Sequence, residues 1–234
     1  LAHAEAIEAR VLEAENLVAG KDTTLEGELR ITASEWMIAT ILAPLLPPFL
    51  AEHGGLSLDL VAEARHLNLF RREADIALRP SSFDQSEVRQ RAIAVLQFGL
   101  YASADYLRRR GTPDYSHGGH GHLLVAAGTG LGNTLVDAQW LPPILGGARV
   151  TARANGRLLM AQLAAAGAGI ACLPRPLGDS IAGLRRLPTP GPAPRPQIWM
   201  GVHRNARAIR RVKAATDFLA DAFHRVRGAL DPKD

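Results

Sequence analysis

One stretch of the chain, residues 155–174 (NGRLLMAQLAAAGAGIACLP), limits the possible folds more than any other. It starts with Asn155, whose side-chain oxygen suits a helix N-cap because it accepts a hydrogen bond from a free N–H group of the first turn. Leu159, Leu163 and Ala166 follow at helical spacing. This spacing predicts a short helix that presents these three residues to a core.

The second half of this stretch predicts a buried strand directly after the helix. Gly167 and Gly169 end the helix, since glycine adopts the left-handed conformation at a helix C-terminus without a steric penalty. Residues 170–173 are all apolar, as in a parallel strand that is covered on both faces, and Pro174 ends the strand. The stretch therefore predicts a helix–strand unit of an α/β domain, with a helix N-terminus open to an anion or a polar ligand.

The rest of the chain also alternates between strand and helix patterns. The runs that predict strands are residues 28–33, 56–62, 75–79, 123–127, 149–154 and 198–203. The runs that predict helices are residues 1–20, 34–46, 67–73, 103–110 and 206–227. Residues 88–102 fit one or two strands with a bend at Gly99. The first elements follow the order βαβαβ, which is typical of a doubly wound α/β unit.

Three segments are expected to lie outside these elements or to extend them. Residues 187–196 are rich in proline, which predicts an extended connector. The tail, residues 228–234, is expected to fray. The first residues are already helical in composition and lack Met, so we expect the chain to begin inside a longer element.

Composition excludes several classes of protein. With 234 residues, 47% of them hydrophobic, the chain can form one or two domains. Basic residues cluster at 108–110 and 204–213, a pattern more typical of solvated helix faces than of a nucleic-acid-binding stripe. The single cysteine, Cys172, excludes an internal disulfide and is expected in the core. No run approaches the ~18 apolar residues of a membrane span, and the first residues lack the features of a signal peptide, so we expect a cytoplasmic location.

Motifs for metal binding, nucleotide binding and catalysis are weak. His117, His120 and His122 lie in a glycine-rich run without a Cys or carboxylate close behind, so we expect an exposed loop rather than a metal site. Residues 128–132 (GTGLG) lack the Lys-Ser/Thr pair of a P-loop and the full GxGxxG pattern. GxSxG and HExxH motifs are absent. We therefore expect no catalytic residue, no metal and no cofactor.

The residues just beyond the predicted strands form the candidate ligand site, because ligands of open α/β sheets bind beyond the carboxyl ends of the strands. Helix N-termini at Ser34 and Asn155 would offer free N–H groups to an anion, and Arg79 could pair with two of its oxygens. Glu35 and Glu63 would favour a ligand that also bears an amine or hydroxyl groups; alternatively, both are surface charges. The residues at these strand ends are Ser34, Glu35, Trp36, Glu63, Arg79, Pro80, Ser81, Thr129, Gly130, Ala154, Asn155 and Gly156.

Several segments, in this order and spacing, resemble the effector-binding domain of LysR-type transcriptional regulators. The run AAAGAGIACLP, with an asparagine about a dozen residues before its first glycine, resembles the second lobe of that domain. The run EADIALR is similar to the Gly-x-x-Asp-x-Ala pattern of the family. The segments that carry the resemblance are residues 26–32, 42–53, 58–61, 73–79, 100–107, 155–174 and 212–223. The turn at Gly54-Gly55 and the loop 115–122 depart from the family, at places where its members vary.

The resemblance implies an α/β fold of two Rossmann-like lobes joined by two crossovers, similar to type II periplasmic binding proteins. Residues 1–24 would end a linker helix, residues 25–97 and 200–234 would form lobe I, and residues 98–199 would form lobe II. The crossovers would lie near residues 97–99 and 196–199, which places Trp199 at the cleft.

The resemblance also implies partners. A small, anionic effector would bind between the lobes, and promoter DNA would bind an N-terminal winged helix-turn-helix domain that does not precede Leu1 here. The chain would form a homodimer or tetramer and would not contact a membrane.

Two other functions fit the same fold. A solute-binding protein of a transporter shares the two-lobe plan but needs export; the gene upstream of Leu1 would encode an apolar export signal in that case and a basic helix-turn-helix in the other. An enzyme of this plan, such as a deaminase of porphyrin precursors or a dehydratase, would need a reactive cysteine or an acid/base pair. Rapid thiol labelling of Cys172 would support that alternative.

Overall fold

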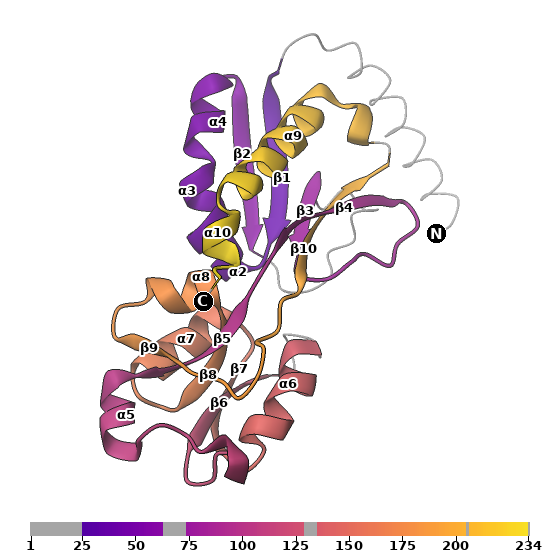
Figure 1. Cartoon of the computed structure of the whole chain (residues 1–234). Helices are drawn as coiled ribbons and strands as arrows, with labels where there is room; N and C mark the ends of the chain where they lie inside the picture. The colour runs from indigo at the N-terminus through magenta and orange to yellow at the C-terminus, as the bar shows by residue number, and fades with distance from the viewer. Residues whose placement is uncertain (1–24, 63–73, 129–134, 205, 234) are drawn as a thin grey trace, which may run out of the picture.

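Two mixed five-stranded sheets organise the part of the chain that the computed structural model describes, residues 25–62, 74–128, 135–204 and 206–233. Figure 1 shows one sheet above the other, with the chain passing between them twice. The predicted α/β fold with two lobes is confirmed. The predicted helices over residues 1–20 and 67–73 lie outside the described residues.

The first sheet has the strand order β2–β1–β3–β10–β4. Strand β1 pairs in parallel with β2 and β3, whereas β10 runs antiparallel to β3 and β4. Because β10 comes near the end of the chain, this sheet is completed only after the second sheet has formed its strands. Its strands are β1 (Gly27–Ala33), β2 (Leu56–Ala62), β3 (Ile76–Arg79), β4 (Val88–Val95) and β10 (Gln197–His203).

The second sheet has the order β7–β6–β8–β5–β9. Strand β6 pairs in parallel with β7 and β8, and β5 runs antiparallel to β8 and β9. Every residue of β8 is buried, as its apolar sequence predicts. The strands are β5 (Phe98–Ser103), β6 (Leu123–Ala127), β7 (Arg149–Ala154), β8 (Ile170–Pro174) and β9 (Leu184–Leu187).

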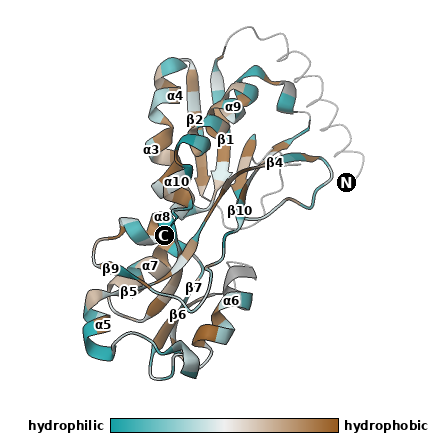
Figure 2. Cartoon of the chain, in the orientation of Figure 1, coloured by the Kyte–Doolittle hydropathy of each residue, from teal (hydrophilic) through white to brown (hydrophobic). Residues whose placement is uncertain are grey.

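The helices pack on these sheets with their apolar sides inward, and Figure 2 shows hydrophilic residues on the outer side of α5 and α9. Around the first sheet lie α2 (Glu35–Met37), α3 (Ala43–Leu45), α4 (Pro47–Glu52), α9 (Arg210–Arg225) and α10 (Arg227–Leu230). Around the second lie α5 (Ala104–Arg110), α6 (Leu135–Leu145), α7 (Arg157–Ala165) and α8 (Arg175–Ser180). Short 3₁₀ turns cover Tyr115–His117 and Ala206–Ala208. Within the described ranges, every helix is too short or too polar to cross a bilayer.

The helical segment after β1 contains a π-helical turn, Ile38–Leu42, between α2 and α3. Its i→i+5 bonding is shown by the N–H of Ala43, which donates to the carbonyl of Ile38. Such turns occur mostly as single insertions in α-helices, often at functional sites. The segment breaks at Leu46 and restarts at Pro47, as the sequence predicts.

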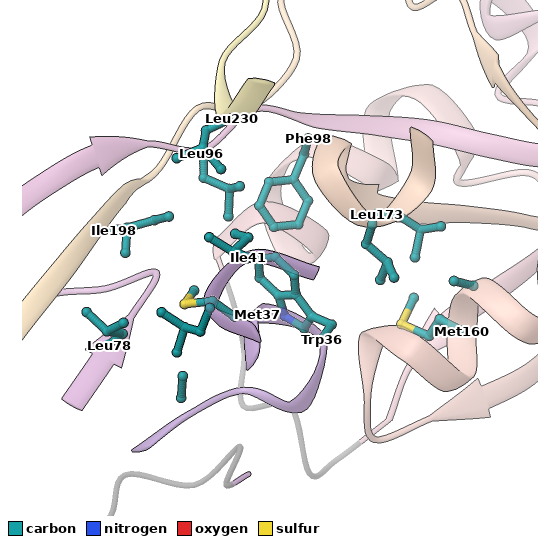
Figure 3. Close-up of a cluster of buried hydrophobic side chains, with 14 of the residues drawn as sticks. Trp36, Met37, Ile41, Leu78, Leu96, Phe98, Met160, Leu173, Ile198 and Leu230 are labelled. Carbon is teal, nitrogen blue, oxygen red and sulfur yellow. The ribbon is translucent and has the colours of Figure 1, made fainter. Parts of the chain in front are cut away.

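One buried cluster joins the cores of the two sheets. Figure 3 shows Trp36 and Met37 of α2 in the same cluster as Phe98 of β5, Met160 of α7 and Leu173 of β8. Trp36 is 4% exposed and the other four are equally buried or more so. The cluster therefore supports the region between the sheets from both sides.

Two short connections, residues 96–97 and 188–196, join the sheets, and hydrogen bonds tie one to the other. The N–H groups of Leu96 and Phe98 donate to the carbonyls of Pro196 and Pro194, at 2.8 and 2.9 Å. The N–H of Gln97 donates to the carbonyl of Leu230, at 2.9 Å. The predicted bend at Gly99 is wrong: Gly99 lies inside β5, and the strands divide at Leu96–Gln97 because the chain changes sheets there.

The predicted start and buried face of α7 are also wrong. Gly156, not Asn155, is the N-cap, and the helix begins at Arg157. Its buried residues are Arg157, Met160, Ala161 and Ala164, while Leu159 is 51% exposed. Leu163 is half-buried and Ala166 is exposed. Two adjacent leucines allow the apolar stripe to be drawn one residue too early or too late, and one residue turns a helix face by about 100°.

The C-terminal tail does not fray as predicted. Residues 227–230 form α10, and the side chain of Leu230 is 2% exposed. Arg195 forms an ion pair with Asp231, with 2.7 Å between Nε and Oδ1. These contacts hold the tail against the second connection between the sheets. The pattern in a short, Gly-containing segment does not reveal them because the partners are distant in sequence.

Candidate functional site

The serine that follows β1 has a buried hydroxyl group without a partner. Ser34 is the N-cap of α2, with φ −65° and ψ 147°, but its side chain makes no capping hydrogen bond. Its Oγ atom is shielded from solvent and has no hydrogen-bond partner in the described part of the chain. A buried polar group without a partner costs about 1–3 kcal/mol, so such atoms are uncommon in folded proteins. This hydroxyl is available to a ligand.

The next two predicted site residues differ in burial. Glu35 is exposed. Trp36 is buried, and Figure 3 shows its ring between α2 and the side of α7 that carries Met160. Trp36 thus packs where the two sheets meet.

At the end of β3, Arg79 is buried and bonded to the neighbouring strand. Its side chain is part of a residue that is 6% exposed. Nη1 donates to the carbonyls of Thr32 and Leu78, at 3.1 and 2.8 Å, and Nη2 donates to Oγ1 of Thr32, at 3.1 Å. These bonds hold the guanidinium group directly behind Ser34, because Thr32 lies two residues before it in β1. They also brace the ends of β1 and β3.

Trp199 lies opposite Arg79 in the β3–β10 ladder. Its residue is half-buried, and the register of β10 against β4 shifts between Ile198 and Trp199. After β3, Pro80 is half-buried and Ser81 is exposed. The structure therefore brings Arg79 and Trp199 together at the edge of the first sheet nearest the connections.

In the second sheet, the predicted residues follow β7. Ala154 is 3% exposed, and its carbonyl accepts a hydrogen bond from the N–H of Gly128, at 2.7 Å. A Cβ atom on Gly128 would lie 3.2 Å from that carbonyl oxygen, so the close approach favours glycine. Asn155 is exposed, and Gly156 caps α7 through its extended backbone. Glu63, Thr129 and Gly130 lie outside the described residues and stay predictions.

Sequence reasoning missed a buried cation at the start of α7. Arg157 is 3% exposed; its Nη1 donates to the carbonyl of Cys172 at 3.0 Å, and its guanidinium carbon lies 5.4 Å from the ring centre of Phe98. A cation over an aromatic face is stabilised by the ring quadrupole. The signal was its position: Arg157 shares the i, i+3, i+4, i+7 face with Met160, Ala161 and Ala164.

A second polar cluster lies beside the connection at Gln97. Arg175 donates through Nε to Oδ2 of Asp179 at 3.0 Å and through Nη1 to Oε1 of Gln97 at 3.2 Å. The hydroxyl of Tyr101 donates to Oδ1 of Asp179 at 2.7 Å, and burial raises the pKa of Tyr101. This cluster ties β5 and α8 to the connection between the sheets.

The histidine run does not form a metal site in the described residues. No group of three or more His, Cys, Asp or Glu side chains there could hold a metal ion. His122 is buried and bonded to the hydroxyl of Tyr106, at 3.1 Å, and burial lowers its pKa. His117 bonds Asp114 at 2.7 Å; hydrogen bonds from Ser116 and His117 lower the pKa of Asp114 to about 2. The expectation of a wholly exposed loop is wrong at His122.

Comparison with known sequences identifies the family. Residues 22–224 match the family described as the LysR substrate binding domain. The chain belongs to this family. A curated relative, the HTH-type transcriptional regulator CrgA of Neisseria meningitidis serogroup C, is 34% identical over 151 residues, which cover 63% of this chain and 50% of that protein. The chain spans about half the length of this relative.

Solved structures show the same fold. The CrgA regulatory domain from Neisseria meningitidis superimposes with a TM-score of 0.72 at 27% identity, covering 84% of this chain and 98% of that chain. The Synechocystis CcmR regulatory domain, described in complex with 2-PG, gives a TM-score of 0.69 at 16% identity, covering 84% and 97%. The two-lobe fold predicted from the resemblance is that of these regulatory domains.

Proposed function

We propose that this chain is the ligand-sensing domain of a LysR-type regulator, which controls transcription through a separate DNA-binding domain. The match of residues 22–224 to the LysR substrate binding domain carries this proposal. The relatives named above are transcriptional regulators, and this favours a regulator over an enzyme or a transport protein. The proposal includes a homodimer or tetramer that acts on promoter DNA in the cytoplasm.

The ligand in this proposal is a small anion held between the sheets. Its first supports are the free hydroxyl of Ser34 and the buried guanidinium group of Arg79 behind it. On the other side, the first N–H groups of α7 lack intrahelical partners, and Arg157 adds a positive charge at the same helix end. Helix N-termini and buried arginines both favour a carboxylate or phosphate over a neutral ligand.

Signal transmission in this proposal depends on the two connections. We place lobe I at residues 25–97 and 200–234, lobe II at 98–199, and the end of a linker helix at 1–24. A ligand that bonds Ser34 on one sheet and α7 on the other would stabilise one angle between the lobes. Metabolite and DNA affinity would then be coupled, so that operator DNA changes the affinity for the metabolite by the same factor.

A thermal-shift screen against small carboxylates, amino acids and aromatic acids tests this function. A ligand at 100 times its Kd stabilises the folded state by about 2.7 kcal/mol, which raises the melting temperature measurably. We expect the shift to disappear in Asn155→Leu and to persist in Gln162→Leu, which makes a similar change at another exposed position of α7. Equal shifts in both variants would place the ligand elsewhere.

A further inference from the structure

The first sheet carries a pocket far from the connections between the sheets. It has a volume of about 300 Å³ and lies between the start of α9 and the β4–β10 ladder. Its wall on β4 is Arg89–Arg91, which pairs with Met200–Val202 of β10. The connection to the second sheet begins at the opposite end of β4, at Leu96. None of the residues proposed above for the site between the lobes lines this pocket.

The floor of the pocket is apolar, whereas its rim is positively charged. Met200, Val202 and Val212 are buried and form the floor. The positive charges come from two strand residues and two residues near the start of α9: Arg89, Arg91, Arg207 and Lys213. Asp217 is the acidic residue among those that line the pocket.

One of these charges is already paired, and three are not. Nη2 of Arg91 donates to the carbonyl of Thr216 at 2.6 Å and lies 4.0 Å from Oδ1 of Asp217. Arg89, Arg207 and Lys213 make no hydrogen bond or ion pair with any residue that the structure describes. Three unpaired cations around one apolar pocket repel each other, and a bound anion would remove this repulsion.

The charge pattern of α9 points the same way. Helices favour acidic side chains or a capping Ser, Thr, Asp or Asn at their N-terminus. The N-cap of α9 is Ile209, which makes no side-chain bond, and its first turn contains no acidic residue. Lys213 and Arg207 thus lie against the positive end of the helix dipole, an arrangement that an anion in the pocket would stabilise.

We infer that this pocket is a second ligand site, distinct from the site between the lobes, for a small organic anion with an apolar body, such as an aromatic or branched aliphatic carboxylate. The carboxylate pairs with Arg89 and Lys213, and the apolar body covers Val202 and Val212. Inorganic phosphate has the charge but no apolar body, and a neutral amide has the body but no charge. Both therefore bind more weakly than the carboxylate.

Methyl NMR of the full chain, titrated separately with benzoate, benzamide and inorganic phosphate, tests this inference. We expect benzoate to shift the methyl signals of Val202 and Val212 saturably, with benzamide and phosphate at least about tenfold weaker. The double variant Arg89→Gln, Lys213→Gln weakens benzoate binding at least about tenfold, because a hydrogen bond between charged groups contributes that much or more. Both residues are exposed, so the variant keeps the fold. Affinity also falls between 0.05 and 0.5 M NaCl.

The matched control changes the same charges on the second sheet. The double variant Arg149→Gln, Arg185→Gln alters two exposed arginines and leaves benzoate affinity unchanged. The inference is overturned if benzoate gives no saturable shift at Val202 and Val212, if benzamide binds equally well, or if both double variants weaken binding equally. Signals of Met160 report the site between the lobes, so loss of one site is distinguishable from loss of the other.

Discussion

Two strand-to-helix junctions of this molecule begin with the same dipeptide, Ala-Ser. Ala33-Ser34 joins β1 to α2, and Ala102-Ser103 joins β5 to α5. The two serines have nearly the same backbone conformation, with φ and ψ of −65° and 147° at Ser34 and −71° and 152° at Ser103. The hydroxyl of Ser103 accepts a hydrogen bond from the N–H of Tyr106 at 3.2 Å, whereas that of Ser34 is buried without a partner in the described residues.

The difference shows that local geometry alone does not decide the role of an N-cap serine. The junction at Ser103 follows the usual rule, since the side chain satisfies a free N–H of the first turn. The junction at Ser34 breaks the rule beside a π-helical turn and the buried Arg79. Departures from local rules concentrate at functional sites. We therefore assign a structural role to Ser103 and a ligand-binding role to Ser34.

The largest effect that tests this comparison is expected at Trp36. Without a side-chain cap, the junction at Ser34 depends on packing, and Trp36 fills the space between α2 and α7. We expect Trp36→Ala to lower the free energy of unfolding by about 3–5 kcal/mol in urea titrations. The control, Leu159→Ala, removes an exposed side chain of α7 and should change it by less than about 0.5 kcal/mol. A loss below 1 kcal/mol at Trp36 would contradict the packing role.

A smaller effect separates the two serines themselves. Ser103→Ala removes a cap and should lower the free energy of unfolding by about 1 kcal/mol. Ser34→Ala removes a hydroxyl without a partner, so it should leave that free energy unchanged or raise it slightly. The same urea titrations measure both variants. Equal losses in the two would show that both serines cap their helices.

The smallest effect is a pH dependence near the Ser103 junction. The hydroxyl of Tyr106 accepts the N–H of Leu123 at 2.8 Å and donates to Nδ1 of neutral His122. Burial lowers the pKa of His122, so the unfolded chain takes up a proton first as the pH falls below about 6.5. Stability is then lost towards lower pH, at a fraction of the about 1.4 kcal/mol per pH unit that one proton contributes.

Thermal unfolding between pH 7.5 and 5.5 measures this dependence. His122→Asn keeps an acceptor for Tyr106 but does not titrate, so it should flatten the curve. His120→Asn, at an exposed histidine of the same loop, should leave the slope unchanged. An unchanged slope in His122→Asn would assign the pH dependence to other groups.

The elements that the sequence predicts well are those with a strong period. Strands β1, β2, β6, β8 and the long helix α9 lie where alternation or helical spacing places them. The sequence did not predict α6, α8 or β9. Two prolines interrupt the pattern of α6, α8 contains a proline and a glycine within six residues, and β9 has only four residues.

The candidate site was predictable in position but not in its bonds. Strand ends are visible in the sequence, so Ser34 and Arg79 could be named. The partners of Arg79 lie in β1, 47 residues earlier, and the packing of Arg157 on Phe98 joins two different strands and helices. Such contacts depend on how the strands are ordered in the sheets. For the same reason, nothing in the Ala-Ser dipeptide distinguishes Ser34 from Ser103.

The most direct measurement compares ligand affinity at the two serines. The carboxylate that gives the largest thermal shift in the screen is titrated by calorimetry against the unmodified chain, Ser34→Ala and Ser103→Ala. A hydrogen bond to a charged group contributes about 1.5–3 kcal/mol, so we predict a loss of affinity of at least about tenfold in Ser34→Ala and no change in Ser103→Ala. Equal affinity in all three proteins would contradict the assignment of Ser34 to the ligand site.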